Sequence, residues 1–278
     1  MKILSNRTAL VTGAAGGFGR VICKALVENG ASVLAADVDG RGLEALAAAT
    51  PGSLETRVLD ISDPAACAAA VEHARTRFGS LDILVNNGAM GMGAFRSDHM
   101  TRLVGIEEID PAMWDRFIRV NHSGAWYLTK AAYPAMKAKG WGRVVNVTAS
   151  FFTMLRGSFH PYGPAKAGLE AMSAGHAAEF AGTGVTVNVV VPGGPADTPI
   201  VPAEAPYSRG DLIAPAKMLA PIPWLCSAEA DAATGKRYIA ANWDESKPVA
   251  QARAASEAGI AWPELAATPV WPGGKPKA

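Results

Sequence analysis

The sequence has little cysteine and little histidine, and neither is spaced as metal ligands usually are. Its three cysteines, Cys23, Cys67 and Cys226, are far apart in the chain, and its five histidines form no ligand pattern. A disulfide framework and a zinc-type site are therefore both disfavoured, and we expect no metal. Scattered thiols are typical of a reducing compartment.

The chain also lacks a block of basic residues and a long apolar run. Its formal net charge is only +1, which gives nucleic-acid binding no electrostatic support. No apolar run approaches the length of a membrane span, and polar residues at 5–7 interrupt the N-terminus before a signal-peptide core can form. We therefore expect a cytoplasmic protein with no nucleic-acid and no membrane partner.

What the sequence does have is a glycine-rich turn between a strand pattern and a helix pattern. Ala9-Leu10-Val11 is typical of a buried strand, and the apolar positions from Phe18 onward recur at helical spacing. Glycines such as Gly13, Gly17 and Gly19 let the backbone come close to a pyrophosphate, whose charge the N–H groups at the helix start bind. The next strand pattern ends in Asp37, whose carboxylate suits an adenosine ribose. Together these features predict dinucleotide binding.

Strand and helix patterns alternate along most of the chain. Hydrophobic residues make up 49% of 278, enough for one large core, and no linker or repeat divides the sequence. The alternation predicts an α/β fold, a Rossmann-type doubly wound parallel sheet of about seven strands in a three-layer α/β/α arrangement. We expect residues 1–278 to form a single dinucleotide-binding catalytic domain. Its proline-rich stretch at about 193–223 is predicted to be a lid, and about 244–278, with Trp262 and Trp271, an irregular tail.

Local signals refine this pattern. Asp63-Pro64 and Asp110-Pro111 each place a capping acid before a proline at the first helical position. We expect Pro134 to kink or end the second of these helices. Residues 149–161 are predicted to be a loop, and a helix is expected from Tyr162 to about residue 181.

Polar side chains follow several predicted strands, at the sheet edge where ligands of open α/β sheets bind. Tyr162 and Lys166 then stand four residues apart on one helix face. An ammonium beside a phenol would lower the phenol pKa from about 10 and let it exchange a proton with an alcohol near neutral pH. The same spacing also fits an amphipathic pair with a packed tyrosine and a solvated lysine.

The chain resembles the short-chain dehydrogenase/reductase family, simple oxidoreductase branch, over about residues 5–242. The resemblance rests on motifs in the family's order: T-G-x-x-x-G-x-G at Thr12–Gly19, Asp60-Ile61, Asn86-Asn87-Gly88-Ala89, the Asn121 of VNHSG, Tyr162-x-x-x-Lys166, and Pro192-Gly193.

The resemblance implies roles for the matching residues. Tyr162 would be the general acid/base, Lys166 would hold the nicotinamide ribose and lower the tyrosine pKa, and Asn121 would anchor a proton-relay water. Asp60 would bind near the adenine, Asn87 near the riboses, and Thr198 at the nicotinamide carboxamide. The implied cofactor-binding set is Gly13, Gly17, Phe18, Gly19, Asp37, Asp60, Ile61, Asn87, Gly88, Tyr162, Lys166, Pro192, Gly193 and Thr198.

The sequence departs from the family pattern at the catalytic serine. Ala149 stands at the usual position, thirteen residues before the tyrosine. A loop bulge would let Ser150 supply the hydroxyl instead, with Thr148 as the alternative. A site with no hydroxyl is the third possibility. Ala89 also replaces the last glycine of N-N-A-G, the segment leading to Thr198 is one residue longer than common, and the last strand lacks a glycine pair.

NAD is favoured over NADP because Asp37 would repel a 2′-phosphate and the glycine loop offers no basic partner. Arg41, the nearby cation, fits a solvated helix face. Apolar side chains flank the predicted entrance and favour an apolar or aromatic substrate, although ordinary core packing explains them equally well. They are Met90, Met92, Phe95, Phe151, Phe152, Met154 and Trp224.

We therefore predict an oxidoreductase that transfers a hydride between NAD(H) and a secondary alcohol or ketone. Its catalytic residues are expected to be Tyr162, Lys166, Ser150 and Asn121. The family resemblance implies a homodimer or homotetramer paired through residues 111–136 and 161–181. One alternative is an NADP-linked carbonyl reductase, and another is a catalytically idle dinucleotide-binding sensor or scaffold, which Ala149 keeps open.

Overall fold

The structure is a computed structural model that describes residues 2–266. Its strands are β1 (Thr8–Thr12), β2 (Ser32–Asp37), β3 (Leu54–Val58), β4 (Ile83–Asn86), β5 (Gly142–Val147), β6 (Val185–Val191), β7 (Lys236–Ile239) and β8 (Glu257–Gly259). Its α-helices are α1 (Gly17–Glu28), α2 (Gly40–Ala49), α3 (Pro64–Phe78), α4 (Pro111–Ile118), α5 (Gly124–Lys139), α6 (Phe151–Leu155), α7 (Tyr162–Glu179), α8 (Pro221–Leu225), α9 (Val249–Ser256) and α10 (Pro263–Ala266). Shorter helical turns are η1 (Met92–Ala94), η2 (Ile106–Glu108), η3 (Arg119–Ser123), η4 (Arg209–Asp211), η5 (Pro215–Leu219), η6 (Ala228–Ala230) and η7 (Ala240–Asn242).

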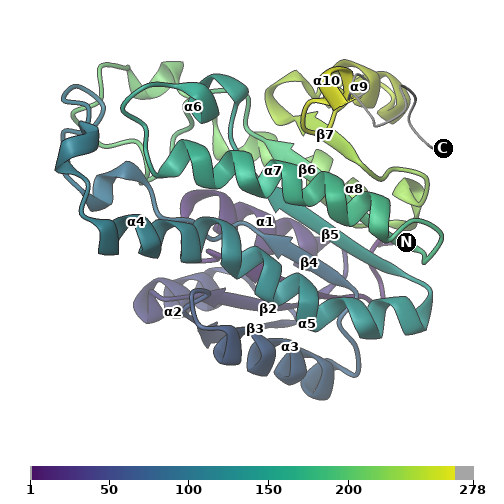
Figure 1. Cartoon of the computed structure of the whole chain (residues 1–278). Helices are drawn as coiled ribbons and strands as arrows, with labels where there is room; N and C mark the ends of the chain where they lie inside the picture. The colour runs from purple at the N-terminus through teal and green to yellow at the C-terminus, as the bar shows by residue number, and fades with distance from the viewer. Residues whose placement is uncertain (1, 267–278) are drawn as a thin grey trace, which may run out of the picture.

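The strands form a sheet in the order β3-β2-β1-β4-β5-β6-β7-β8. Neighbours are parallel from β3 to β7, and β8 adds an antiparallel edge. Helices cover both faces, with α3, α5 and α7 on the face turned toward the viewer in Figure 1 and α1 behind the sheet. The Rossmann-type prediction is confirmed, and the sheet has one strand more than expected. The chain order reverses between β1 and β4, where doubly wound folds open a ligand crevice.

The predicted helix openings are confirmed. Asp63 caps α3 by accepting from the N–H groups of Ala65 and Ala66, and Asp110 caps α4 by accepting from Ala112. These carboxylates satisfy N–H groups that have no partner inside the helix. The prediction that Pro134 could end its helix is wrong, because α5 continues to Lys139. Packing of the buried face of α5 outweighs the one backbone bond that proline removes.

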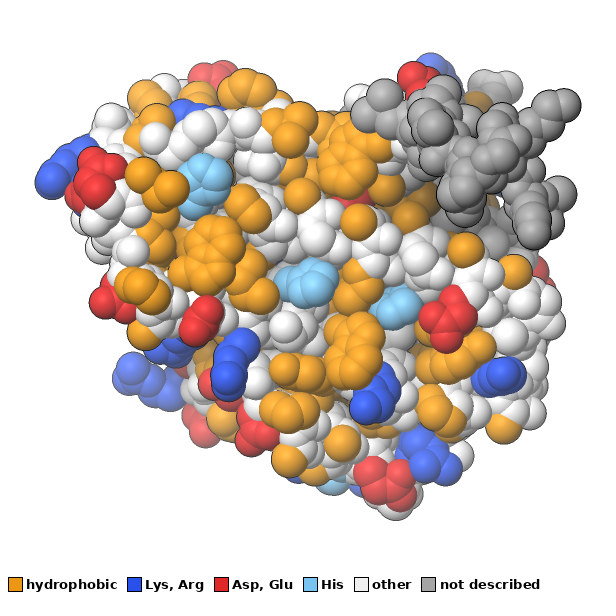
Figure 2. All heavy atoms as spheres, in the orientation of Figure 1, with side chains coloured by type: hydrophobic (Ala, Val, Ile, Leu, Met, Phe, Trp, Pro, Cys, Tyr) orange, Lys and Arg blue, Asp and Glu red, His pale blue; other side chains and the backbone are white. Residues whose placement is uncertain are grey.

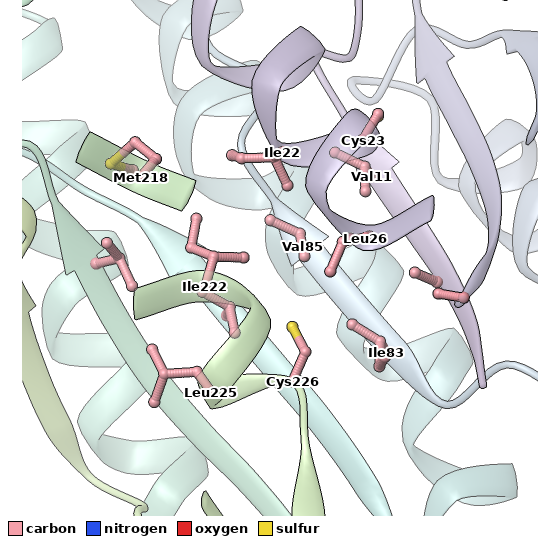
Figure 3. Packing of buried hydrophobic residues seen from close by; sticks show 14 of the residues in the cluster. Val11, Ile22, Cys23, Leu26, Ile83, Val85, Met218, Ile222, Leu225 and Cys226 are labelled. Carbon is pink, nitrogen blue, oxygen red and sulfur yellow. The ribbon is translucent and has the colours of Figure 1, made fainter. Parts of the chain in front are cut away.

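The second half of the predicted lid belongs to the core. Met218 on η5 and Ile222 and Leu225 on α8 are buried in one apolar cluster with Ile22 and Leu26 of α1, and Figure 3 shows Met218 and Ile222 on the side facing that helix. Prolines in this stretch open short helices instead of preventing them, because they stand in the first turn, where their missing N–H is harmless. The lid prediction for 193–223 is therefore wrong from about residue 215 onward.

The predicted irregular tail is wrong for residues 249–266, which form α9, β8 and α10. β8 pairs with β7 so that Arg237 stands opposite Ala258, a residue about twenty positions later in the chain. Its sequence, Glu-Ala-Gly, carries no strand pattern of its own, so only this pairing makes it a strand. Trp271 and the rest of 267–278 lie outside the described residues.

Figure 2 shows the face covered by α3, α4, α5 and α7, on which charged side chains are scattered singly among apolar and histidine side chains. Trp114 of α4 and Trp126 of α5 are large apolar residues that remain 38% and 41% exposed. Across residues 2–266, every helix is too short or too polar to cross a membrane.

Candidate active site

A cavity of about 1100 Å³ opens beyond the carboxyl ends of the central strands, at the reversal of chain order. Most sequence-predicted site residues line it, whereas Gly19 and Asn121 do not. The lining includes Gly13, Gly17, Phe18, Asp37, Asp60, Ile61, Asn87, Gly88, Ser150, Tyr162, Lys166, Pro192, Gly193 and Thr198.

The glycines of the loop after β1 are needed for close packing. Gly13 has a φ of +64°, and a Cβ there would lie 2.7 Å from the Cα of Gly88. A Cβ at Gly19 would lie 2.0 Å from the carbonyl oxygen of Gly13, so Gly19 lets α1 pack on the loop instead of facing the cavity. At Gly17 a Cβ would lie 2.8 Å from Thr198 Cγ2, on the lid side. The loop therefore offers bare backbone to a ligand.

Thr12 and Asn87 tie this loop to the end of β4. The hydroxyl oxygen of Thr12 accepts from the N–H groups of Asn87 (3.1 Å) and Gly88 (3.0 Å). The Asn87 amide in turn donates to the carbonyls of Thr12 (3.0 Å) and Gly13 (3.1 Å). Asn87 therefore fixes the shape of the glycine loop while it lines the cavity.

Carboxylates gather at the end of the cavity next to β2 and β3. Asp37 accepts from the backbone N–H groups of Ala15 and Asp39, both at 3.0 Å, which orients its carboxylate at the loop. Asp39 also lines the cavity. Asp60 follows β3, and the backbone N–H of Ser62 holds the pKa of its carboxyl below the usual value. This end suits hydroxyl groups that donate hydrogen bonds, such as those of a ribose.

Tyr162 and Lys166 stand on the first turns of α7, beside β5. Lys166 is buried, and its Nζ donates to the Val147 carbonyl at 2.8 Å and lies 5.9 Å from the Tyr162 ring centre. Burial lowers the pKa of Lys166 to about 8 and raises that of Tyr162 to about 12. The expected lowering of the tyrosine pKa is therefore wrong for this structure, because low-polarity surroundings outweigh the nearby ammonium.

The loop after β5 presents Ser150 to the cavity. Part of the predicted 149–161 loop is helical, since Ser150 caps α6 with its Oγ 3.2 Å from the Thr153 nitrogen and 2.9 Å from the Thr153 hydroxyl. The Thr148 hydroxyl is buried and donates to Glu170 Oε2 at 2.7 Å. Of the two hydroxyls, that of Ser150 has the freer proton for a ligand.

A buried ion pair supports this loop from behind. Glu170 Oε2 lies 2.6 Å from Arg237 Nη1, and neither side chain is more than 4% exposed. Arg237 also donates to the Ala149 carbonyl at 2.7 Å and lies 4.1 Å from the Phe151 ring centre. The Ala261 N–H donates to Glu170 Oε1 at 3.2 Å, so the C-terminal segment is tied to the same pair.

Asn121 lies in the π-helical turn η3, between α4 and α5. Its side chain is buried and makes a two-way bond with the backbone of Met90: Oδ1 accepts from the N–H at 2.7 Å and Nδ2 donates to the carbonyl at 2.9 Å. Such turns often occur at functional positions. Here the turn holds the strand-4 loop in place.

The apolar residues expected at the entrance divide between wall and core. Met90, Met92 and Phe152 line the cavity, with Phe152 74% exposed at its rim. Phe95 instead stacks on Phe117, and Trp224 packs against Tyr238 and Trp243 in the core. The remaining two, Phe151 and Met154, pack inside around α6, Phe151 against Trp262 and Met154 buried.

Several lining residues escaped sequence reasoning. They are Asp39, His99, Met100, Arg116, Arg156, Phe159, Ile200 and Tyr207. Their positions after β2, β4, β5 and β6 were the available signal, because segments at the carboxyl ends of parallel strands face the ligand. Within the described range, no three His, Cys, Asp or Glu side chains gather as a metal would require.

Known proteins resemble this chain in sequence and in fold. A sequence model described as short chain dehydrogenase matches residues 7–206. The 3-oxoacyl-[acyl-carrier-protein] reductase FabG of Escherichia coli is 36% identical over 188 residues, which cover 68% of this chain and 73% of that protein. The D-beta-hydroxybutyrate dehydrogenase of Cupriavidus necator is 33% identical over 69% of this chain and 71% of its own length. A crystal structure described as a putative short-chain dehydrogenase/reductase from Burkholderia xenovorans superposes with a TM-score of 0.74 at 28% identity, covering 86% of this chain and 96% of that one.

Proposed function

The chain belongs to the short-chain dehydrogenase family, and we propose that it transfers a hydride between NAD(H) and a secondary alcohol or ketone. The observation that carries the proposal is the shared cavity. A bare glycine loop, the Asp37 carboxylate and the Tyr162–Lys166 pair all line one space of about 1100 Å³. A dinucleotide-binding loop and a proton-transfer pair in one cavity suit this chemistry.

The residues present fit a nicotinamide dinucleotide. Side chains are missing at Gly13 and Gly17, where a Cβ would clash, and Asp37 and Asp39 face the place of a ribose. NAD is favoured over NADP because a 2′-phosphate would meet these carboxylates. Of the lining cations, Arg116 on α4 lies near Asp60, whereas Arg156 follows α6 and Lys166 stands on α7, both in the segment after β5. The bound nicotinamide would supply or accept the hydride.

The chain's own residues would handle the proton. Tyr162 donates a proton to the ketone oxygen in the reduction and accepts the hydroxyl proton of the alcohol in the oxidation. Ser150 donates a hydrogen bond to the same oxygen. Lys166, held by the Val147 carbonyl, binds the nicotinamide ribose, and Asn121 fixes the loop at Met90 from below the site.

We also propose that the protein forms a homo-oligomer and works in the cytoplasm. A homodimer or homotetramer would cover the face of α5 and α7, where Trp126 is 41% exposed. Cys23, Cys67 and Cys226 are buried free thiols, which suits a reducing cytoplasm.

A substrate panel tests the proposal. Aliphatic, aromatic and sugar secondary alcohols are offered with NAD and with NADP to the wild type and to Tyr162→Phe, with Tyr133→Phe as the matched control. Tyr133 is stacked on Phe180, away from the cavity. We expect turnover with NAD that falls at least about a hundredfold in Tyr162→Phe and not in Tyr133→Phe.

Two outcomes would favour the alternatives. A higher kcat/KM with NADP than with NAD would indicate an NADP-linked carbonyl reductase. NADH binding without turnover of any substrate, or equal rates in wild type and Tyr162→Phe, would indicate an idle dinucleotide-binding protein.

A further inference from the structure

We propose that the substrate carries a carboxylate and that Arg156 binds it at the substrate end of the cavity. The proposal rests on the function proposed above and names the substrate class of that same site. Arg156 stands between Ser150 and Tyr162, the two residues proposed to contact the substrate oxygen.

Arg156 lies close to the proton-transfer residue. It lines the cavity, and its guanidinium carbon is 5.0 Å from the ring centre of Phe159 and 6.0 Å from that of Phe152. Phe159 in turn makes an edge-to-face contact with Tyr162, with ring centres 6.2 Å apart. Phe159 therefore contacts both the guanidinium and the phenol ring, and all three side chains line the same cavity.

The guanidinium has no acidic partner within residues 2–266. Two other arginines near the cavity form ion pairs, Arg96 with Glu108 and Arg237 with Glu170. Arg116 lines the cavity near Asp60, where its charge adds to the Ser62 N–H in lowering the pKa of that carboxyl. The lining carboxylates, Asp37, Asp39 and Asp60, stand at the opposite end, beside β2 and β3. At this end Lys166 donates to the Val147 carbonyl and is assigned to the nicotinamide ribose, which leaves the Arg156 guanidinium as the charge available to a substrate among aromatic and methionine side chains.

Such a charge selects an anion. The planar guanidinium fork matches a carboxylate with two parallel hydrogen bonds, and its apolar surroundings strengthen them. A phosphate monoester would bring nearly two negative charges to a single cation in this apolar wall, so a carboxylate is the better match. Met90, Met92 and Phe152 would contact the apolar body of the same substrate.

The test compares acids with their neutral esters. Secondary alcohols with a carboxylate two to five carbons away, such as 3-hydroxy-3-phenylpropanoate, are assayed with NAD beside their methyl esters. The variants are Arg156→Met and Arg156→Lys. Arg75→Met is the matched control, because Arg75 lies on exposed α3 and pairs only with Glu72 at the surface.

We expect the wild type to prefer an acid over its ester. Arg156→Met should raise KM for the acid about 10- to 100-fold, the range of a lost charge-assisted hydrogen bond, with little change for the ester. Arg156→Lys should recover part of the loss, and Arg75→Met should change neither.

Two results would overturn the proposal and leave the proposed function standing. One is an equal kcat/KM for acid and ester in the wild type. The other is weaker NADH binding in Arg156→Met, measured by NADH fluorescence without substrate, since Arg156 would then bind the dinucleotide. Turnover of neither acids nor esters, nor of the wider panel, would instead refute the proposed function itself.

Discussion

Removing one partner of the buried Glu170–Arg237 pair should destabilise the protein strongly. Glu170 is 0% and Arg237 4% exposed by side chain, and together they hold the Thr148 hydroxyl, the Ala149 carbonyl and the Ala261 N–H. Arg237→Met leaves a buried carboxylate with two weaker donors, and Glu170→Met leaves a buried guanidinium with one carbonyl and the Phe151 ring. Each single change should cost about 3–5 kcal/mol of the free energy of unfolding.

The double variant Glu170→Met/Arg237→Met should be less destabilised than either single variant. It removes both charges together, and apolar replacements of a buried pair are often neutral. Urea unfolding followed by circular dichroism gives all four free energies and hence the coupling energy of the pair. Arg75→Met, which breaks the exposed pair with Glu72, is the control and should hardly move the midpoint. Single variants that cost less than about 1 kcal/mol, or a double variant as unstable as the sum of both, would refute this reasoning.

Four further changes have definite expected outcomes. Asp37→Ser should lower the ratio of kcat/KM with NAD to that with NADP about tenfold or more, and an unchanged ratio would remove Asp37 from cofactor selection. Ser150→Ala should lower kcat about 100-fold or more and cost only about 1 kcal/mol of stability for the lost α6 cap. Thr148→Val should mainly lower the urea midpoint, and the reverse pattern would make Thr148 the substrate hydroxyl. Lys166→Met should abolish turnover yet raise the unfolding free energy near pH 7, because the ammonium is charged in both states there and its charged form is less favourable in the buried site than in the unfolded chain, as its lowered pKa of about 8 indicates. Wild-type stability from this group therefore rises between about pH 8 and 10.5, so urea midpoints of the two proteins should converge toward pH 10, and a constant difference would contradict the sign. Gly19→Ala should fail to give a native circular-dichroism spectrum or melt far lower, since its Cβ would lie 2.0 Å from the Gly13 carbonyl oxygen; a normal melting curve would show that the loop can shift.

Sequence patterns predicted the helices, strands and turns correctly where the pattern lies within a few neighbouring residues. The glycine turn after β1, the acid-proline openings of α3 and α4, and the alternation of strands and helices up to β7 all depend on residues within a few positions of one another. The Tyr162–Lys166 spacing likewise placed both side chains on one face of α7.

In the last quarter of the chain, contacts between distant residues decided the structure, and local sequence patterns did not predict it. The prolines of 215–223 suggested a mobile lid, yet the surrounding Met218, Ile222 and Leu225 find their burial against α1. β8 exists only because the edge of β7 offers it hydrogen bonds. The local sequence predicts neither contact. Met218 and Ile222 meet a helix nearly two hundred residues earlier in the chain, and β8 consists of residues with no strand propensity.

The sequence by itself determined the fold class, the glycine loop after β1 and the placement of Tyr162 and Lys166 on one helix face, since each is encoded by short-range spacing and by backbone positions that only glycine fits. The tertiary structure alone decided three things about the site. It turned Thr148 toward Glu170 and left Ser150 to the cavity, and it used the Asn121 amide to hold Met90. It also put Arg156 at the cavity wall with no acidic partner among the residues that the structure describes. These outcomes depend on which groups from distant parts of the chain meet in the protein interior. A polar group buried there needs a hydrogen-bond partner, because its burial otherwise costs free energy.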